Sequence, residues 1–183
     1  MLLDRIDNFD IFRPKMDSSK EVLQAIATFK ADISPSFPYV NAELGGWDYD
    51  QTNQALLLKL SDGKWGTLHS HKIALRGARD QEECHALLAW ITGQINEIYD
   101  RRDRLTPRYV SQAGLKIMEI LKLTPMTNCK ACGYATCMAY AAALREGEIG
   151  LADCLPLWED KYRDKREKLQ AYLESFGWRA LDA

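Results

Sequence analysis

Four cysteines in the last third of the chain have residue types and a spacing that suit metal binding. They follow the pattern C-x2-C-x4-C, and a fourth comes after sixteen more residues, which places them at Cys129, Cys132, Cys137 and Cys154. Four thiolates are a complete ligand set for one iron–sulfur cluster or one structural zinc ion. No other group of residues in this sequence has a spacing of comparable specificity.

The spacing alone leaves three chemistries open. Many zinc ribbons pair two C-x2-C knuckles, and the second knuckle is absent here. The common ferredoxin patterns are absent too, since the four- and two-residue gaps stand in the opposite order to the plant type. An exported chain could use the four cysteines as two disulfides and leave Cys84 as an odd thiol. We rank the cluster first, zinc second and disulfides third.

The residues around the cysteines favour the cluster. Gly133 lets the backbone pass close to an inorganic core. Cys137 is expected in the first turn of an alanine-rich helix over 135–145, where free N–H groups and the helix dipole stabilise an anionic thiolate cluster. Tyr140 and Leu144 share the face of Cys137 and are expected to wall the site with apolar atoms.

Besides its cysteines, the segment Ala113–Leu157 carries a set of small and polar residues at characteristic places. They are Thr127, Asn128, Gly133, Thr136 and Gly147. With them the segment, about a quarter of the chain, resembles the four-cysteine [4Fe-4S] domain of anaerobic electron-transfer proteins. These include the corrinoid iron–sulfur protein of the CO dehydrogenase/acetyl-CoA synthase system and the B subunit of the Rnf complex. The resemblance implies one [4Fe-4S] cluster on all four cysteines, and a corrinoid protein or other metalloenzyme as redox partner.

We therefore expect a one-electron carrier or redox partner for an anaerobic metalloenzyme rather than an enzyme, because four cysteines leave no iron site open for a substrate. The alternative is a cluster- or zinc-stabilised interaction or sensor module without a role in electron transfer.

Composition narrows the class of protein. The 183 residues are 46% hydrophobic and 27% charged, as in ordinary globular proteins. A net charge of −2 gives no overall attraction to nucleic acid or to an anionic membrane. No window approaches the roughly 20 apolar residues of a membrane span. The acidic start MLLDRIDNFD does not resemble a signal peptide, so we expect a cytoplasmic protein.

The chain is expected to divide near Thr106–Pro107 into an α+β domain, 1–105, and a helical cluster domain, 106–183. The first is expected to hold a four-stranded antiparallel sheet with helices on one face. This order resembles one half of a TATA-binding-protein-like fold in topology alone.

Five segments are expected to build the first domain. They are a helix over 18–33, a strand through 40–44, a hairpin over 55–70 turning at Asp62–Gly63, a strand over 72–76 and a long helix opening at Asp80. The second domain is expected to have a helix from Pro107 to before Pro125, the helix over 135–145, and a charged helix over 157–176.

Two pairs of residues resemble other reactive sites. His69 and His71 are expected on one strand face, but nothing nearby completes a metal site, so an exposed strand face is favoured. Cys84 and His85 could form a nucleophile and base. Adjacent helix residues point apart, however, and Cys84 shares an apolar stripe, which favours a buried structural thiol.

Two further features have ordinary structural readings. Trp47, Tyr49 and Trp65 could form an aromatic binding face on the sheet, with core or rim packing as the default. The run KYRDKREK over 161–168 mixes both signs of charge, which favours a solvated helix face over a nucleic-acid patch.

Overall fold

The computed structural model describes residues 1–14 and 22–178. The chain divides into two compact units, Met1–Ser111 and Gln112–Ala183. Residues 106–111 belong to the first unit, where Asn41 Nδ2 donates hydrogen bonds to the carbonyls of Arg108 (2.8 Å) and Val110 (2.9 Å). The division into an α+β domain over 1–105 and a helical cluster domain over 106–183 stays a prediction.

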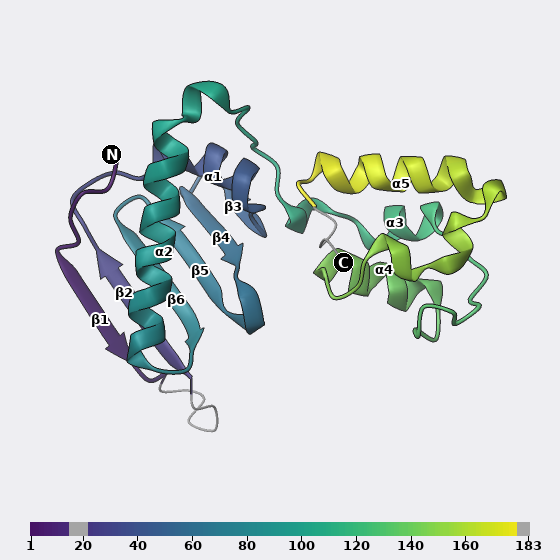
Figure 1. Ribbon diagram of the computed structural model, residues 1–183, viewed down its shortest axis with the longest axis horizontal. Coiled ribbons are helices and arrows are strands. Elements are labelled where there is room, and N and C mark those ends of the chain that lie inside the picture. Colours follow the sequence, from purple (N-terminus) through teal and green to yellow (C-terminus); the bar gives the residue numbers. More distant parts are fainter. Residues whose placement is uncertain (15–21, 179–183) are drawn as a thin grey trace. The chain divides into compact units, whose positions relative to one another are not determined.

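The first unit contains a six-stranded antiparallel sheet with the strand order β1-β2-β6-β5-β4-β3 (Figure 1). The strands are β1 (Asn8–Phe12), β2 (Leu23–Thr28), β3 (Asp48–Asp50), β4 (Ala55–Lys59), β5 (Trp65–His69) and β6 (Lys72–Ala78). The expected hairpin is confirmed as β4 and β5, with a 3-10 turn over Ser61–Gly63 between them.

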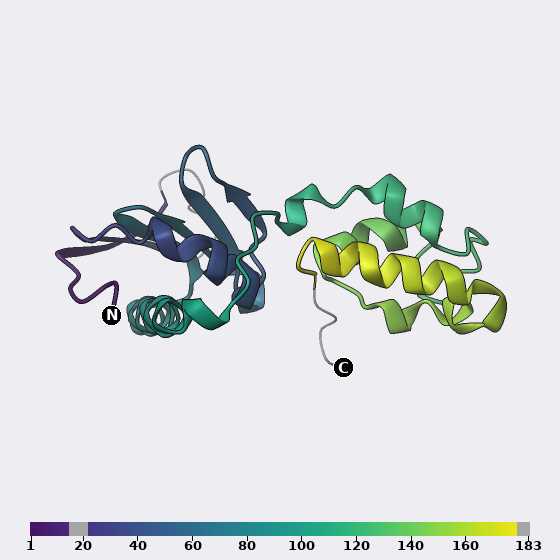
Figure 2. The ribbon, with the colours of Figure 1, turned by 90° about the horizontal axis from the view of Figure 1, so that it is seen from above.

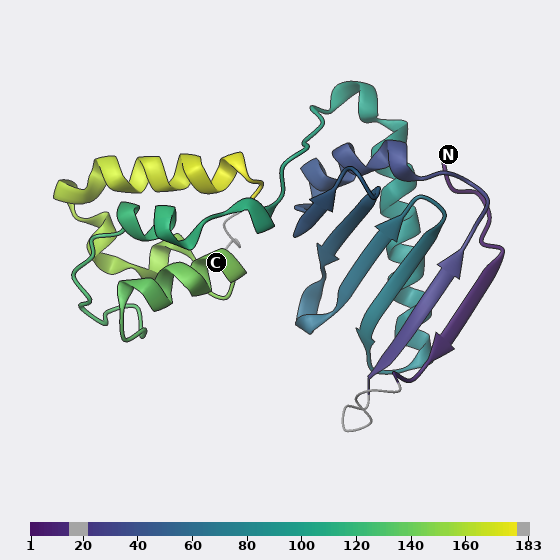
Figure 3. The same cartoon turned by 180° about the vertical axis from the view of Figure 1, so that it is seen from behind.

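Helices α1 (Phe37–Leu44) and α2 (Gln81–Asp100) cover one face of this sheet (Figure 2). Their buried side chains meet alternate residues of the strands in one apolar core, which includes Phe37, Val40, Leu56, Leu58, Leu68, Ile73, Leu75, Leu88, Ile91, Ile95 and Ile98. The α+β class, with helices on one face of an antiparallel sheet, is confirmed. Figure 3 shows the other face, which neither α1 nor α2 covers.

Two of the expected elements have the wrong type. Where a helix was expected over 18–33, the structure has strand β2 at Leu23–Thr28; the proposed cap, Ser18–Ser19, lies outside the described residues. The apolar residues at helical spacing suggested a helix because Ile26 is apolar as well, although it lies on the face of β2 opposite the buried Ala25 and Ala27. The strand lies inside the sheet, between β1 and β6.

The strand expected through 40–44 is helix α1. Pro38 stands in its first turn, which suits proline, and Gly45 ends it with a left-handed φ of 70°. The sheet has six strands rather than four, because β1, β2 and β3 were not expected as strands and the strand expected through 40–44 is a helix.

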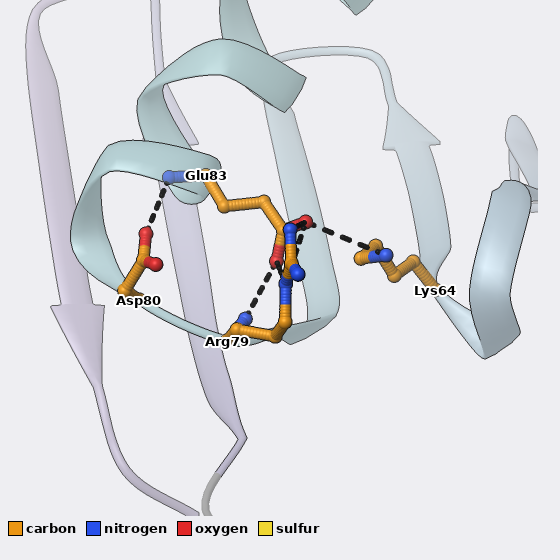
Figure 4. A network of polar contacts seen from close by, with 4 residues as sticks. All are labelled: Lys64, Arg79, Asp80 and Glu83. Atoms are coloured by element: carbon orange, nitrogen blue, oxygen red, sulfur yellow. Dashed lines mark hydrogen bonds and ion pairs between the residues drawn. The ribbon is translucent and has the colours of Figure 1, made fainter.

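The expected start of α2 is confirmed in detail. Asp80 caps the helix by accepting the N–H of Glu83 at 2.8 Å (Figure 4). Glu83 in turn accepts the backbone N–H of Arg79 at 2.7 Å and lies 3.4 Å from the buried ammonium of Lys64. The hydrogen bonds from Arg79 are the main cause that lowers the pKa of Glu83 to about 2.

The second unit is helical, with α3 (Ile117–Leu123), α4 (Cys137–Glu146) and α5 (Arg163–Ser175). The helix expected from Pro107 begins only at Ile117. The residues before it cannot start the helix, because the carbonyls of Arg108 and Val110 accept hydrogen bonds from Asn41 within the first unit. The helix expected over 157–176 is interrupted by 3-10 turns at Leu155–Trp158 and Asp160–Tyr162, and α5 follows. None of the helices in the described part of the chain has the length and apolarity to cross a bilayer.

Candidate metal centre

Several residues of the loop between α3 and α4 have a left-handed backbone conformation. Met126, Asn128 and Lys130 have φ of 58°, 49° and 62°, and Gly133 has a φ of 84°. Left-handed backbone costs an L residue about 1–2 kcal/mol, and only glycine and, to a lesser degree, asparagine adopt it readily. Three non-glycine residues have this conformation within five positions, and such unfavourable backbone conformations cluster at functional sites.

Side chains of this loop hold the start of α4. Asn128 Oδ1 accepts the N–H of Cys137 at 2.8 Å, and Thr136 Oγ1 caps the helix by accepting the N–H of Ala139 at 3.1 Å. Cys137 is thus the first residue of α4, as expected. Cys137 therefore lies at the positive end of the dipole of α4.

Tyr140 connects α4 to the loop that carries the last cysteine. Its side chain is 1% exposed, and its hydroxyl donates a hydrogen bond to the Gly150 carbonyl at 3.2 Å. Burial, followed by the charges of Cys154 and Cys132, raises its pKa. The phenol therefore stays protonated and keeps donating to Gly150.

The loop after Gly150 is closed by two further hydrogen bonds. Asp153 Oδ2 accepts the N–H of Gly150 at 2.8 Å, and the Cys154 N–H donates to the Leu151 carbonyl at 3.3 Å. These contacts fix the backbone on both sides of Asp153, so Cys154 reaches the site from a rigid turn.

All four cysteines of the pattern line one pocket. Its other lining residues are Pro125, Thr127, Asn128, Lys130, Tyr134, Thr136, Tyr140 and Pro156. None of the five cysteines, all within the described residues, is in a disulfide. The sulfurs border the pocket rather than meet at one point: among the described residues, no three His, Cys, Asp or Glu side chains are gathered closely enough to hold a metal ion.

The four thiols have unequal surroundings. Cys154 is 5% exposed, and burial raises its pKa to about 11. Cys129 is exposed, and hydrogen bonds from the Ala131 N–H and the Thr127 hydroxyl lower its pKa. A buried thiol with a raised pKa ionises when a cation binds it, and iron or zinc supplies that charge. Four thiols that line one pocket are a donor set of the kind that iron or zinc takes.

The other candidate pairs are separated by the structure. His69 ends β5, whereas His71 lies in the following turn with Nδ1 3.0 Å from the Ala31 carbonyl, so the expectation of one shared strand face is wrong. Cys84 is fully buried in the core, which confirms the structural thiol, and His85 packs edge-on against Phe9 instead.

The three aromatic residues that were considered as a binding face have different ring partners. Trp47 and Trp65 contact each other edge to face, with ring centroids 6.1 Å apart. Tyr49 stacks on Tyr109 instead, at 6.5 Å. In the charged run over 161–168, most side chains bind other residues of the second unit, as in the pair Lys168–Asp164 at 2.7 Å.

Sequence reasoning missed the residues that hold the cysteines. Asn128 and Tyr140 were noted for other reasons, and their bonds to the backbone of Cys137 and Gly150 join segments nine and ten residues apart. The one available signal was Thr136, a favoured N-cap residue directly before Cys137.

Comparison with known proteins places the cysteine segment among iron–sulfur sequences. Residues 125–156 match a family model described as "Putative Fe-S cluster". Gamma subunits of the acetyl-CoA decarbonylase/synthase complex share 42% identity over 55 residues (Methanocaldococcus jannaschii) and 46% over 54 residues (Methanothermobacter thermautotrophicus). An uncharacterized protein of M. jannaschii shares 38% over 61 residues.

These similarities cover only part of each protein. The matched stretches are about 30% of this chain, and 11% and 12% of the two gamma subunits; for the uncharacterized protein they are 33% and 27%. No solved structure matches the chain significantly. The TATA-binding-protein-like topology stays a prediction. The family match supports an iron–sulfur cofactor in residues 125–156.

Proposed function

We propose that the chain binds one [4Fe-4S] cluster through Cys129, Cys132, Cys137 and Cys154 and carries single electrons to or from a metalloenzyme of anaerobic metabolism. The observation that carries this proposal is that all four thiols line one pocket within the segment that matches an iron–sulfur family. Cysteine ligation gives such clusters potentials between about −700 and +450 mV.

The relatives support the partner that we propose. Gamma subunits of the acetyl-CoA decarbonylase/synthase complex share this segment, which supports a corrinoid protein or other metalloenzyme as the redox partner. Such a role needs reduced thiols and hence a cytoplasmic location. The unit Met1–Ser111 serves as a module that selects the partner.

A second candidate function is a cluster- or zinc-stabilised interaction or sensor module. It is favoured by the position of Cys154 and Tyr140, which belong both to the site and to the apolar core of the second unit. A metal at that place stabilises the fold whether or not it transfers electrons.

Anaerobic purification with metal analysis separates these candidates. A [4Fe-4S] protein yields about four iron and four sulfide ions per chain and a reduced-state EPR signal. Zinc without sulfide would refute the cluster. Iron and sulfide that cannot be reduced and reoxidised reversibly would leave the structural role in place of electron transfer.

The ligand set is tested by two cysteine variants. Cys137→Ser is expected to lose the visible absorption of the cluster. Cys84→Ser is the matched control, because Cys84 lies in the core of the other unit and should leave the absorption unchanged. Full absorption in Cys137→Ser would remove Cys137 from the ligands.

A further inference from the structure

The four cysteines of the pocket differ in their exposure to solvent. Cys129 is exposed, and so is every other residue over 126–131. Cys132 and Cys137 are half-buried, and Cys154 is 5% exposed. A small molecule in solution can therefore reach the Cys129 side chain, but it cannot reach Cys154 without opening the core of the second unit.

Cys154 and Cys132 are held by the packing of the second unit. Cys154 belongs to its apolar core, and Cys132 packs against that core. The main chain of Cys154 is also fixed, because its N–H donates to the Leu151 carbonyl at 3.3 Å and its carbonyl accepts the Leu157 N–H at 2.9 Å. Loss of the Cys154 side chain therefore leaves a cavity inside the core.

Cys137 is held by its main chain. It is the first residue of α4, and its N–H donates to Asn128 Oδ1 at 2.8 Å. The next turn of this helix contains Tyr140 and Ala141, which are buried in the core of the second unit. A shift of Cys137 therefore requires a shift of the start of α4.

Cys129 is connected to the second unit less firmly. Its sulfur accepts hydrogen bonds from the Thr127 hydroxyl and the Ala131 N–H, each only two residues away in the chain. In the described part of the chain, no hydrogen bond between main-chain groups joins Cys129 to another residue, and Cys129 lies outside the apolar core. A change at Cys129 therefore leaves the core and the start of α4 in place.

We propose that Cys129 is the exchangeable ligand of the metal site, whose place a small thiol from solution can take, while the fold holds Cys132, Cys137 and Cys154. This inference rests on the proposed cluster and concerns the one ligand through which dissolved thiols act on it. In the exchange, the bond from the Cys129 sulfur to the metal breaks and a bond from the incoming sulfur forms. The incoming thiol gives up its proton and the released Cys129 thiolate takes one up, so neither charge nor electrons are gained or lost.

The test uses the full chain with Cys129→Ala, reconstituted anaerobically with iron and sulfide in the presence of a phosphine reductant. The probe is 2-mercaptoethanol, a small uncharged thiol. It is expected to raise the visible absorption and the iron and sulfide content of Cys129→Ala about tenfold, because the exposed position lets it complete the ligand set. Native mass spectrometry should find one bound thiol on each loaded chain. Ethylene glycol, which has only hydroxyl groups, should give no gain.

Cys154→Ala and Cys137→Ala are the matched variants at the ligands that the fold holds. The thiol is expected to restore both less than Cys129→Ala, because these positions are buried or half-buried. Since Cys154→Ala also opens the core, Cys137→Ala gives the decisive comparison: Cys137 lies outside the buried core of the second unit.

The outcomes separate the exchangeable ligand from the cluster itself. A wild-type chain without iron and sulfide would refute the proposed function. An intact wild-type cluster with no thiol-dependent gain in Cys129→Ala, or with an equal gain in Cys137→Ala, would overturn the exchange at Cys129 alone. A Cys129→Ala chain that is fully loaded before any thiol is added would show that Cys129 is not a ligand, which also overturns the exchange.

Discussion

The two units of the chain keep their folds by different means. In the first unit, the 20-residue α2 packs a long row of buried aliphatic side chains against a six-stranded sheet. In the second, helices of 7, 10 and 13 residues surround a core that includes Tyr140 and Cys154. Helices this short are marginal by themselves. Both units have apolar cores, but the core of the second also includes residues of the proposed metal site.

Removal of the metal should give the largest difference in stability between the two units. Chelation under anaerobic, reducing conditions is expected to lower the unfolding midpoint of the second unit by about 10 °C or more, because the buried Cys154 thiol loses the metal that it would bind. The first unit should keep its midpoint. Heteronuclear NMR of the whole chain reads the two units separately, and equal losses in both would contradict the division.

Changes at Tyr140 should be next in size. Tyr140→Ala is expected to cost about 3–5 kcal/mol of the unfolding free energy of the second unit, since it leaves a cavity. Tyr140→Phe keeps the ring and loses only the bond to Gly150, at about 1 kcal/mol. Urea denaturation followed by cluster absorption measures both.

The matched change in the first unit is Ile95→Ala, at a fully buried position of α2. It should cost about 2–5 kcal/mol there and leave the cluster absorption unchanged. Bleaching of the cluster in Ile95→Ala at low urea would show that the two cores are coupled.

Substitutions of Asn128 are expected to change the stability of the second unit by a smaller amount. Asn128→Gly keeps the left-handed backbone but loses the acceptor for the Cys137 N–H, at an expected cost of about 1 kcal/mol. Asn128→Ala should cost about 1 kcal/mol more, because alanine is strained at this φ. Denaturation of the second unit measures both. Equal stability of the two variants would show that the loop relaxes and that its backbone is not fixed.

The smallest expected effect is a loss of stability of the first unit at low pH. The pKa of Glu83 is lowered from 4.5 to about 2. Because the folded-state pKa is the lower one, its contribution is complete above about pH 4.5 and is lost as the pH falls toward 2. Denaturation at several pH values should show this loss in wild type and a weaker one in Glu83→Gln. An identical acid profile in both would exclude Glu83 as its source.

Local signals in the sequence were enough for some elements. The alternating Leu56 and Leu58 with the Asp62–Gly63 turn predicted the hairpin, and Asp80 before an apolar stripe predicted α2. The same reasoning failed for β2 and α1, where the apolar pattern is short and fits both periods. There the neighbours in the sheet decided the structure.

The cysteine pattern by itself predicted that the four thiols lie together and that Cys137 lies in the first turn of a helix, because ligand spacing and helix pattern are local properties of the chain. Tertiary structure alone decided that Asn128 holds Cys137, that Tyr140 ties α4 to the loop of Cys154, and that one thiol is buried while Cys129 stays exposed. These are contacts between segments brought together only when the second unit packs its core, and burial exists only after that packing.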